Sequence, residues 1–164
     1  MNNSSGTILG FDFGLRRIGV AVGQTLTGTA TPLQTLRCTD GRPDWEVVTR
    51  LIAEWSPIAL VVGLPITADG TETSFLTAVR AFVRRLEGRY RLPVHTVDEH
   101  LSSREAESRL VAGEGYLVRG RSARSGAQLR PTRREDIDRV AAQVILQTWL
   151  ADQTASNHAG GLTQ

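Results

Sequence analysis

The first part of the chain contains three short apolar runs separated by turns. The runs cover residues 7–13, 18–23 and 29–36, and the linkers between them, 14–17 and 24–28, are rich in Gly, Arg and Thr. Linkers this short join neighbouring antiparallel strands and leave no room for a crossover. The pattern therefore predicts an antiparallel meander of three strands.

Helical and extended patterns alternate in the next part of the chain. Apolar side chains recur at helical spacing over residues 44–55 and 74–90, which predicts two amphipathic helices. Apolar runs at residues 58–62 and 93–97 follow these helices and predict two strands parallel to the first. We therefore expect an α/β fold with a five-stranded mixed sheet, three strands from the meander and two parallel to the first, flanked by helices.

Two capping boxes predict helices in the last third of the chain. Ser102 with Glu105 predicts a helix that ends at Gly113, and Thr132 with Glu135 predicts a second one. In each pair the hydroxyl and the carboxylate bond to backbone N–H groups that a helix N-terminus leaves without partners. The chain is thus expected to end on a helix.

The remaining segments set the predicted domain limits. Residues 113–131 show no periodicity, and we expect a mobile, arginine-rich loop. The final helix is expected to end at Leu150 and residues 151–164 to form a disordered tail. Residues 1–150 are then one domain, as is usual for a chain of 164 residues.

Composition excludes several classes of protein. The 40% hydrophobic and 22% charged residues are typical of a globular domain. The N-terminus lacks the features of a secretory or transit signal, and no apolar run reaches the ~20 residues that span a bilayer. We expect a cytoplasmic protein without membrane contact. Cys38, the single cysteine, can form no intramolecular disulfide.

Asp12 is the first candidate for chemistry, because it lies inside an apolar strand. Burying a carboxylate there is unfavourable unless a cation or hydrogen-bond donors compensate it. One interpretation is an Asp that caps the turn at Gly14. The other is a metal ligand at a strand end, where the sites of α/β sheets gather.

Further acidic residues are expected to converge on Asp12. Asp98 and Glu99 end the fifth predicted strand, and the C-terminal ends of parallel strands meet at one edge of a sheet. A solvated turn that starts the next helix explains this pair equally well. Asp138 shares its helix face with two alanines, which would let the helix lie close to the strand of Asp12.

Such a group of carboxylates favours a hard cation, because His and Cys ligands are missing from these motifs. The expected cofactor is Mg²⁺ or Mn²⁺. These ions stabilise the attacking and leaving oxygens of a displacement at phosphorus, typically as a pair about 4 Å apart. Hydrolysis of a phosphodiester suits this arrangement.

The distribution of basic residues indicates the substrate. The chain has no lysine, so all 19 basic residues are arginine, which binds phosphate oxygens in pairs. Six arginines and no acidic residue lie between residues 115 and 134. This segment favours contact with a nucleic-acid backbone. A solvated loop, and codon bias as the source of the arginines, are the alternatives.

Four segments resemble, in order, the motifs of the YqgF/RuvX family. They are GFDFGLRRIGVAV at residues 10–22, VVGLP at 61–65 with Asp69-Gly70, VDEHLSS at 97–103 and IDRVAAQVILQ at 137–147. The resemblance implies a ribonuclease H-like fold, similar to Holliday junction resolvases, and nuclease processing of the 5′ end of pre-16S rRNA.

The same resemblance implies particular site residues. Asp12, Glu99 and Asp138 would be the catalytic, metal-binding acids, with Asp98 as a further candidate ligand. His100 stands where the family usually has arginine, and Ile66-Thr67-Ala68 replaces its usual Leu-Asn-Met, so the substrate contacts can differ. The candidate substrate-binding residues are Arg16, Arg17, Gly63, Pro65, His100, Ser102, Arg119, Arg121, Arg124, Arg133 and Arg134.

Other functions also fit parts of this sequence. Asp12-Phe13-Gly14 before a hairpin resembles the first phosphate loop of actin-like ATPases, but those proteins need a second such loop and two lobes. A resolvase acting on branched DNA, and a binding module that does not cut, both keep the fold and the arginines. We expect a nucleic-acid partner, precursor rRNA or branched DNA, and a monomer or homodimer.

Overall fold

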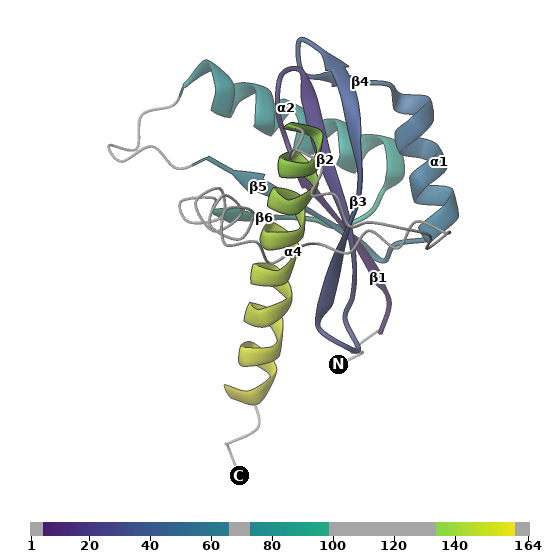
Figure 1. Cartoon of the computed structure of the whole chain (residues 1–164). Helices are drawn as coiled ribbons and strands as arrows, with labels where there is room; N and C mark the ends of the chain where they lie inside the picture. Colours follow the sequence, from purple (N-terminus) through teal and green to yellow (C-terminus); the bar gives the residue numbers. More distant parts are fainter. Residues whose placement is uncertain (1–4, 66–72, 99–133, 160–164) are drawn as a thin grey trace, which may run out of the picture.

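A mixed sheet lies between two layers of helices in the computed structural model (Figure 1), which describes residues 5–65, 73–98 and 134–159. In chain order the elements are β1 (Thr7–Asp12), β2 (Arg17–Gln24), β3 (Thr29–Thr39), β4 (Arg42–Pro43), α1 (Trp45–Trp55), β5 (Ala59–Leu64), α2 (Ser74–Tyr90), β6 (Val94–Asp98) and α4 (Arg134–Ala159). The predicted helix that ends at Gly113 and the predicted loop at 113–131 lie outside the described residues.

The sheet confirms the predicted strand directions. Its order is β4-β3-β2-β1-β5-β6. Strands β1, β2 and β3 form the antiparallel meander. Strand β5 runs parallel to β1, and β6 runs parallel to β5. The C-terminal ends of β1, β5 and β6 therefore reach the same edge of the sheet.

The prediction of five strands was wrong, because the sheet has six. The additional strand, β4, pairs with the end of β3 through a tight turn at Asp40 and Gly41. Both turn residues have positive φ, 50° and 72°, the backbone conformation of the turns that match the twist of a hairpin. A strand of two residues is too short to give an alternating pattern, so the sequence did not reveal it.

The two faces of the sheet carry different layers. Leu9, Phe11 and Phe13 point to the core that α1 and α2 cover, where Phe11 meets Phe82 edge to face at 5.8 Å between ring centres. Ile8 belongs to the core on the opposite face, beneath α4. Because side chains alternate along a strand, Gly10 and Asp12 share that second face with Ile8.

The prediction that residues 151–164 are a disordered tail was wrong for its first part. Helix α4 continues past Leu150 to Ala159. Residues 151–158 are exposed and pack against no core. The pattern of apolar residues therefore stops at Leu150, whereas the helical backbone continues. In the described part of the chain, no helix is long and apolar enough to cross a membrane.

Helix α4 lies unusually close to β1 and β2, because glycines replace side chains beneath it. A Cβ atom on Gly10 would lie 3.0 Å from Cβ of Leu146, and one on Gly23 would lie 3.0 Å from Cδ2 of Leu146. At Gly19 the contact is tightest, since a Cβ atom would lie 1.9 Å from the carbonyl oxygen of Asp138. Position 19 therefore fixes how closely the first turns of α4 approach the sheet.

Replacing Gly19 by alanine should destabilise the protein. The new methyl group would collide with helix backbone, and overpacking of this kind costs about 1–3 kcal/mol. The free energy of unfolding in urea measures the effect. Gly88→Ala is the matched control, because nothing lies within 4 Å of its Cβ position on α2 and Ala favours a helix over Gly by up to about 1 kcal/mol. Equal stability of Gly19→Ala and wild type would contradict this account.

Candidate metal and nucleic-acid site

Asp12 is the last residue of β1 and lies at the sheet edge where the parallel strands end. It is half-buried on the face beneath α4. Its partner on β2 is Gly19, the residue that lies against the backbone of Asp138. The missing side chain at position 19 lets the backbone of Asp138 pack directly against the strand partner of Asp12.

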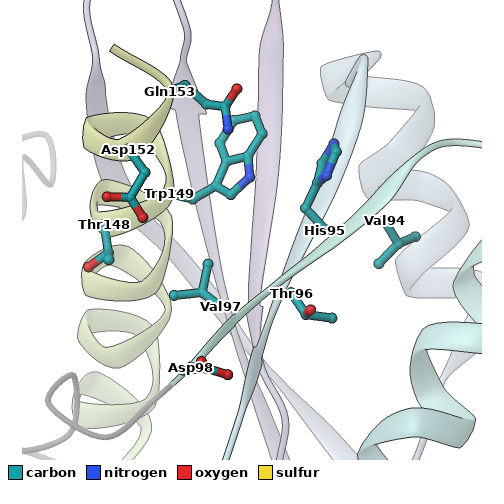
Figure 2. A pocket seen from close by; sticks show the side chains of 9 residues that line it. All are labelled: Val94, His95, Thr96, Val97, Asp98, Thr148, Trp149, Asp152 and Gln153. Carbon is teal, nitrogen blue, oxygen red and sulfur yellow. The ribbon is translucent and has the colours of Figure 1, made fainter. Parts of the chain in front are cut away.

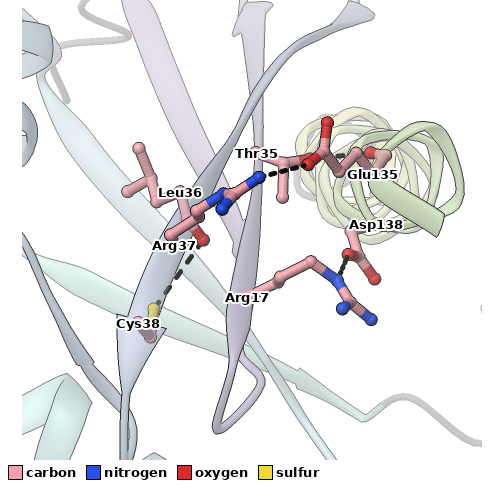
Figure 3. Close-up of polar contacts among 7 residues, drawn as sticks. All are labelled: Arg17, Thr35, Leu36, Arg37, Cys38, Glu135 and Asp138. Carbon is pink, nitrogen blue, oxygen red and sulfur yellow. Dashed lines mark hydrogen bonds and ion pairs between the residues drawn. The ribbon is translucent and has the colours of Figure 1, made fainter. Parts of the chain in front are cut away.

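Asp138 reaches this edge from the first turns of α4. Its Oδ2 atom accepts a hydrogen bond of 2.7 Å from Nε of Arg17 (Figure 3), and the two side chains are 22% and 32% exposed. Among the described residues, nothing donates to its Oδ1 atom. The carboxylate is therefore held through one oxygen and can offer the other to a ligand.

Two side chains of β3 contact the start of α4 (Figure 3). The hydroxyl of Thr35 donates to the backbone carbonyl of Glu135 at 2.7 Å, and Arg37 approaches the carboxylate of Glu135 at 3.7 Å. Further along the helix, the buried amide of Gln143 donates to the carbonyl of Ala30 at 2.9 Å. The hydrogen bonds of Thr35 and Gln143 therefore fix the position of Asp138 as well as that of the helix. The Arg37–Glu135 pair is long and Arg37 is 90% exposed, so this pair adds little.

Asp98, the further candidate ligand, lies on the other face of the sheet. Its partner on β5 is Leu64, which packs into the core under α1 and α2. Partners in a parallel ladder point to the same face, so Asp98 points away from the side that carries Asp12. Glu99 follows Asp98 directly and lies outside the described residues.

Several other predicted contacts also lie outside the described part of the chain, and their roles stay predictions. These residues are His100, Ser102, Arg119, Arg121, Arg124 and Arg133. Within the described residues, no group of three His, Cys, Asp or Glu side chains could hold a metal. The described site thus provides a pair of carboxylates, from Asp12 and Asp138.

The remaining predicted contacts surround this pair. Arg16 is exposed in the turn between β1 and β2, and its carbonyl accepts a hydrogen bond of 2.8 Å from the backbone N–H of Cys38. Gly63 follows Val62, the partner of Phe11, and so lies level with Asp12. Pro65 comes just after β5, and Arg134 is the exposed first residue of α4.

A hollow between β6 and α4 lies away from this pair. His95 and Trp149 line it with their rings 5.1 Å apart (Figure 2). The helix residues of this hollow begin at Thr148, ten positions after Asp138, which corresponds to roughly 15 Å along a helix. It is therefore distinct from the carboxylate pair.

Cys38 takes no part in the site. It lies half-buried on β3, and burial raises the pKa of its thiol from 9.0 to about 11. The thiolate is the nucleophilic form of cysteine, and at neutral pH this side chain stays a thiol.

The described donors fit a hard divalent cation. Asp12 and Asp138 supply carboxylate oxygens, which Mg²⁺ and Mn²⁺ prefer, and the close packing of Asp138 on Gly19 brings the two residues to the same edge of the sheet. Both acids were predicted from the sequence as metal ligands, and that role stays a prediction. The hydrogen bond from Arg17 to Asp138 was not predicted, since no local pattern connects residues so far apart in the chain.

Comparison with solved structures shows the fold. The chain resembles RuvC of Thermus thermophilus in complex with a Holliday junction substrate, with a TM-score of 0.54 and 15% identity over 92% of this chain and 97% of that one. It also resembles Ydc2, the yeast mitochondrial Holliday junction resolvase, with a TM-score of 0.53 and 12% identity over 92% of this chain and 80% of that one. At this identity the likeness is one of fold alone, and it confirms the predicted resolvase-like, ribonuclease H-like architecture.

Comparison with sequences shows the family. A protein of Nitrosococcus oceani named "Putative pre-16S rRNA nuclease" is 49% identical over 92% of this chain and 90% of its own. A protein of the same name from Pseudomonas putida is 45% identical over 90% of this chain and 96% of its own. The sequence model of the family described as "RuvX: Holliday junction resolvase" matches residues 6–152. The chain therefore belongs to the RuvX family, as its motifs predicted.

Proposed function

We propose that this protein is a metal-dependent nuclease that hydrolyses phosphodiester bonds in the 5′ region of precursor 16S rRNA. The observation that carries the proposal is the position of Asp138 over Gly19, the strand partner of Asp12. This arrangement brings two carboxylates from distant parts of the chain to one edge of the sheet. The names of the relatives in Nitrosococcus oceani and Pseudomonas putida support rRNA as the substrate, whereas the family description supports a nuclease that cuts nucleic acid.

Each acidic residue has its own part in this proposal. Asp12 and Asp138 hold Mg²⁺ or Mn²⁺ from β1 and α4, and Glu99, next to the end of β6, completes the set. The bound ion supplies the positive charge that stabilises the attacking and leaving oxygens of an in-line displacement at phosphorus. Asp98 is left out of the set, because its strand partner places it on the opposite face.

Arginines account for binding of the substrate. Arg16 and Arg134 are exposed at the same end of the sheet as the carboxylate pair, and Arg119, Arg121, Arg124 and Arg133 add positive charge to the chain just before α4. Phosphate contacts of this kind position a nucleic acid without reading its sequence. Gly63 and Pro65, with His100 and Ser102, would contact the nucleotides next to the scissile bond.

Asp12→Asn and Asp138→Asn should each lower Mg²⁺-dependent cleavage by at least about 100-fold, because each removes a charged ligand oxygen. Cleavage of a 5′-extended 16S rRNA precursor, followed by gel electrophoresis, measures the rate. Chelation by EDTA should stop the wild type, and Mg²⁺ or Mn²⁺ should restore it.

Asp152→Asn is the matched control for these variants. It removes the same charge from the same helix, at an exposed position beside the hollow between β6 and α4, fourteen residues after Asp138. This variant should cleave as fast as the wild type. A wild type that binds the precursor but shows no metal-dependent cleavage would favour a binding module over a nuclease.

The choice of rRNA is tested by a second substrate. A four-way DNA junction, incubated beside the precursor under the same conditions, should be cut more slowly than the rRNA. Faster cutting of the junction by the wild type, abolished in Asp12→Asn, would overturn the rRNA assignment and favour a resolvase. The metal mechanism would stand in that case.

A further inference from the structure

We propose that Arg17 connects the metal site to the substrate, with Nε holding Asp138 in place while its two Nη groups bind a phosphate of the nucleic acid. The inference rests on the proposed nuclease function and adds a positioning residue to it. It assigns two simultaneous tasks to one guanidinium group, which has donors on two of its edges.

The geometry of the ion pair is the first argument. Arginine often binds a carboxylate through two parallel N–H groups, but here the recorded contact is a single one, from Nε to Oδ2 of Asp138 at 2.7 Å. Figure 3 shows the Nη end of the guanidinium pointing away from the carboxylate. In the described part of the chain, these Nη groups donate no hydrogen bond.

The position of Arg17 is the second argument. It is the first residue of β2 and is joined to Asp12 by the short turn through Gly14. That turn is tight, because a Cβ atom on Gly14 would lie 2.4 Å from the carbonyl oxygen of Arg17. A phosphate bound to the Nη groups would therefore lie at the same edge of the sheet as Asp12 and Asp138.

Burial is the third argument. The side chain of Arg17 is only 32% exposed, whereas that of its strand partner Arg37 is 90% exposed. Both arginines pair with an acidic residue of α4, but the Arg37–Glu135 contact is longer, at 3.7 Å. Arg37 is thus a surface ion pair next to the site and serves as a control for Arg17.

The two tasks give the Arg17 variants distinct properties. Arg17→Gln loses the positive charge and the planar guanidinium group with its donors on two edges. Arg17→Lys keeps the charge, but its three donors sit on one nitrogen. It therefore lacks the planar guanidinium that reaches a carboxylate along one edge and a phosphate along another. We therefore expect Lys to retain phosphate attraction and to lose the hold on Asp138.

Binding without cleavage is measured first, by fluorescence anisotropy of the labelled rRNA precursor in EDTA at several salt concentrations. Arg17→Gln should reduce the slope of log affinity against log salt by about 0.7–0.9, the value of one phosphate contact. Arg17→Lys and wild type should share one slope. An unchanged slope in Arg17→Gln, or an equal reduction in Arg37→Gln, would overturn the phosphate contact.

Cleavage and metal affinity are measured next. Arg17→Lys should lower kcat by about 10-fold or more with little change in KM, and should weaken Mn²⁺ binding, followed by the EPR signal of the free ion. Arg37→Gln should match the wild type in both. A wild-type kcat and Mn²⁺ affinity in Arg17→Lys would overturn the positioning role.

The failure of the nuclease assignment and the failure of the proposed role of Arg17 give different results. If the wild type shows no metal-dependent cleavage, the nuclease assignment fails. If the wild type cleaves and Arg17→Gln binds and cleaves like it, the assignment stands and the proposal for Arg17 fails. Urea unfolding of each variant identifies any loss that comes from misfolding.

Discussion

The close contact between α4 and β2 at Gly19 is the constraint on which the candidate site depends. Gly19 is at once the strand partner of Asp12 and the surface on which the backbone of Asp138 lies. Any side chain at this position would push the helix outward and separate the two carboxylates. Gly19 therefore determines both the packing of α4 and the placement of the two carboxylates. Gly10 and Gly23 allow the same close approach further along the helix.

Charge is the second constraint on this site. Two carboxylates at one sheet edge repel each other when no cation is bound, and their partly buried position weakens the screening by water. The guanidinium of Arg17 offsets part of this repulsion through its contact with Asp138. The carboxylate of Asp138 thus has a cationic partner when no metal is bound, and its Oδ1 atom accepts no hydrogen bond from the described residues.

Much of this architecture could be predicted from the sequence, because it follows from local patterns. Alternation and short linkers predicted the meander, and helical spacing with Asp44 and Ser74 at the helix starts predicted α1 and α2. Strand β4 and the last turns of α4 were not predicted. Strand β4 is too short to give an alternating pattern. The last turns of α4 consist of exposed residues, so they show no apolar residues at helical spacing.

The acidic residues of the candidate site could be predicted from the sequence, but the contacts between side chains of the site could not. Asp12 was conspicuous as a carboxylate in an apolar strand, and Asp138 shared a face with small residues. The pairing of Arg17 with Asp138 joins residues 121 positions apart, which only the folded chain brings together. Gly19 gave no distinct signal, since a glycine in a strand is equally expected at a bulge.

Asp12 and Asp138 are proposed to bind one cation together, and Mn²⁺ titration calorimetry on a double-mutant cycle distinguishes a shared site from independent ones. Two groups that share a ligand give non-additive effects, whereas independent sites add. We expect Asp12→Asn and Asp138→Asn each to weaken Mn²⁺ binding by about 10-fold or more, and the double variant to be weakened by less than the product of the two effects. Fully multiplicative losses, or an Asp138→Asn protein that binds Mn²⁺ like the wild type, would contradict a shared site.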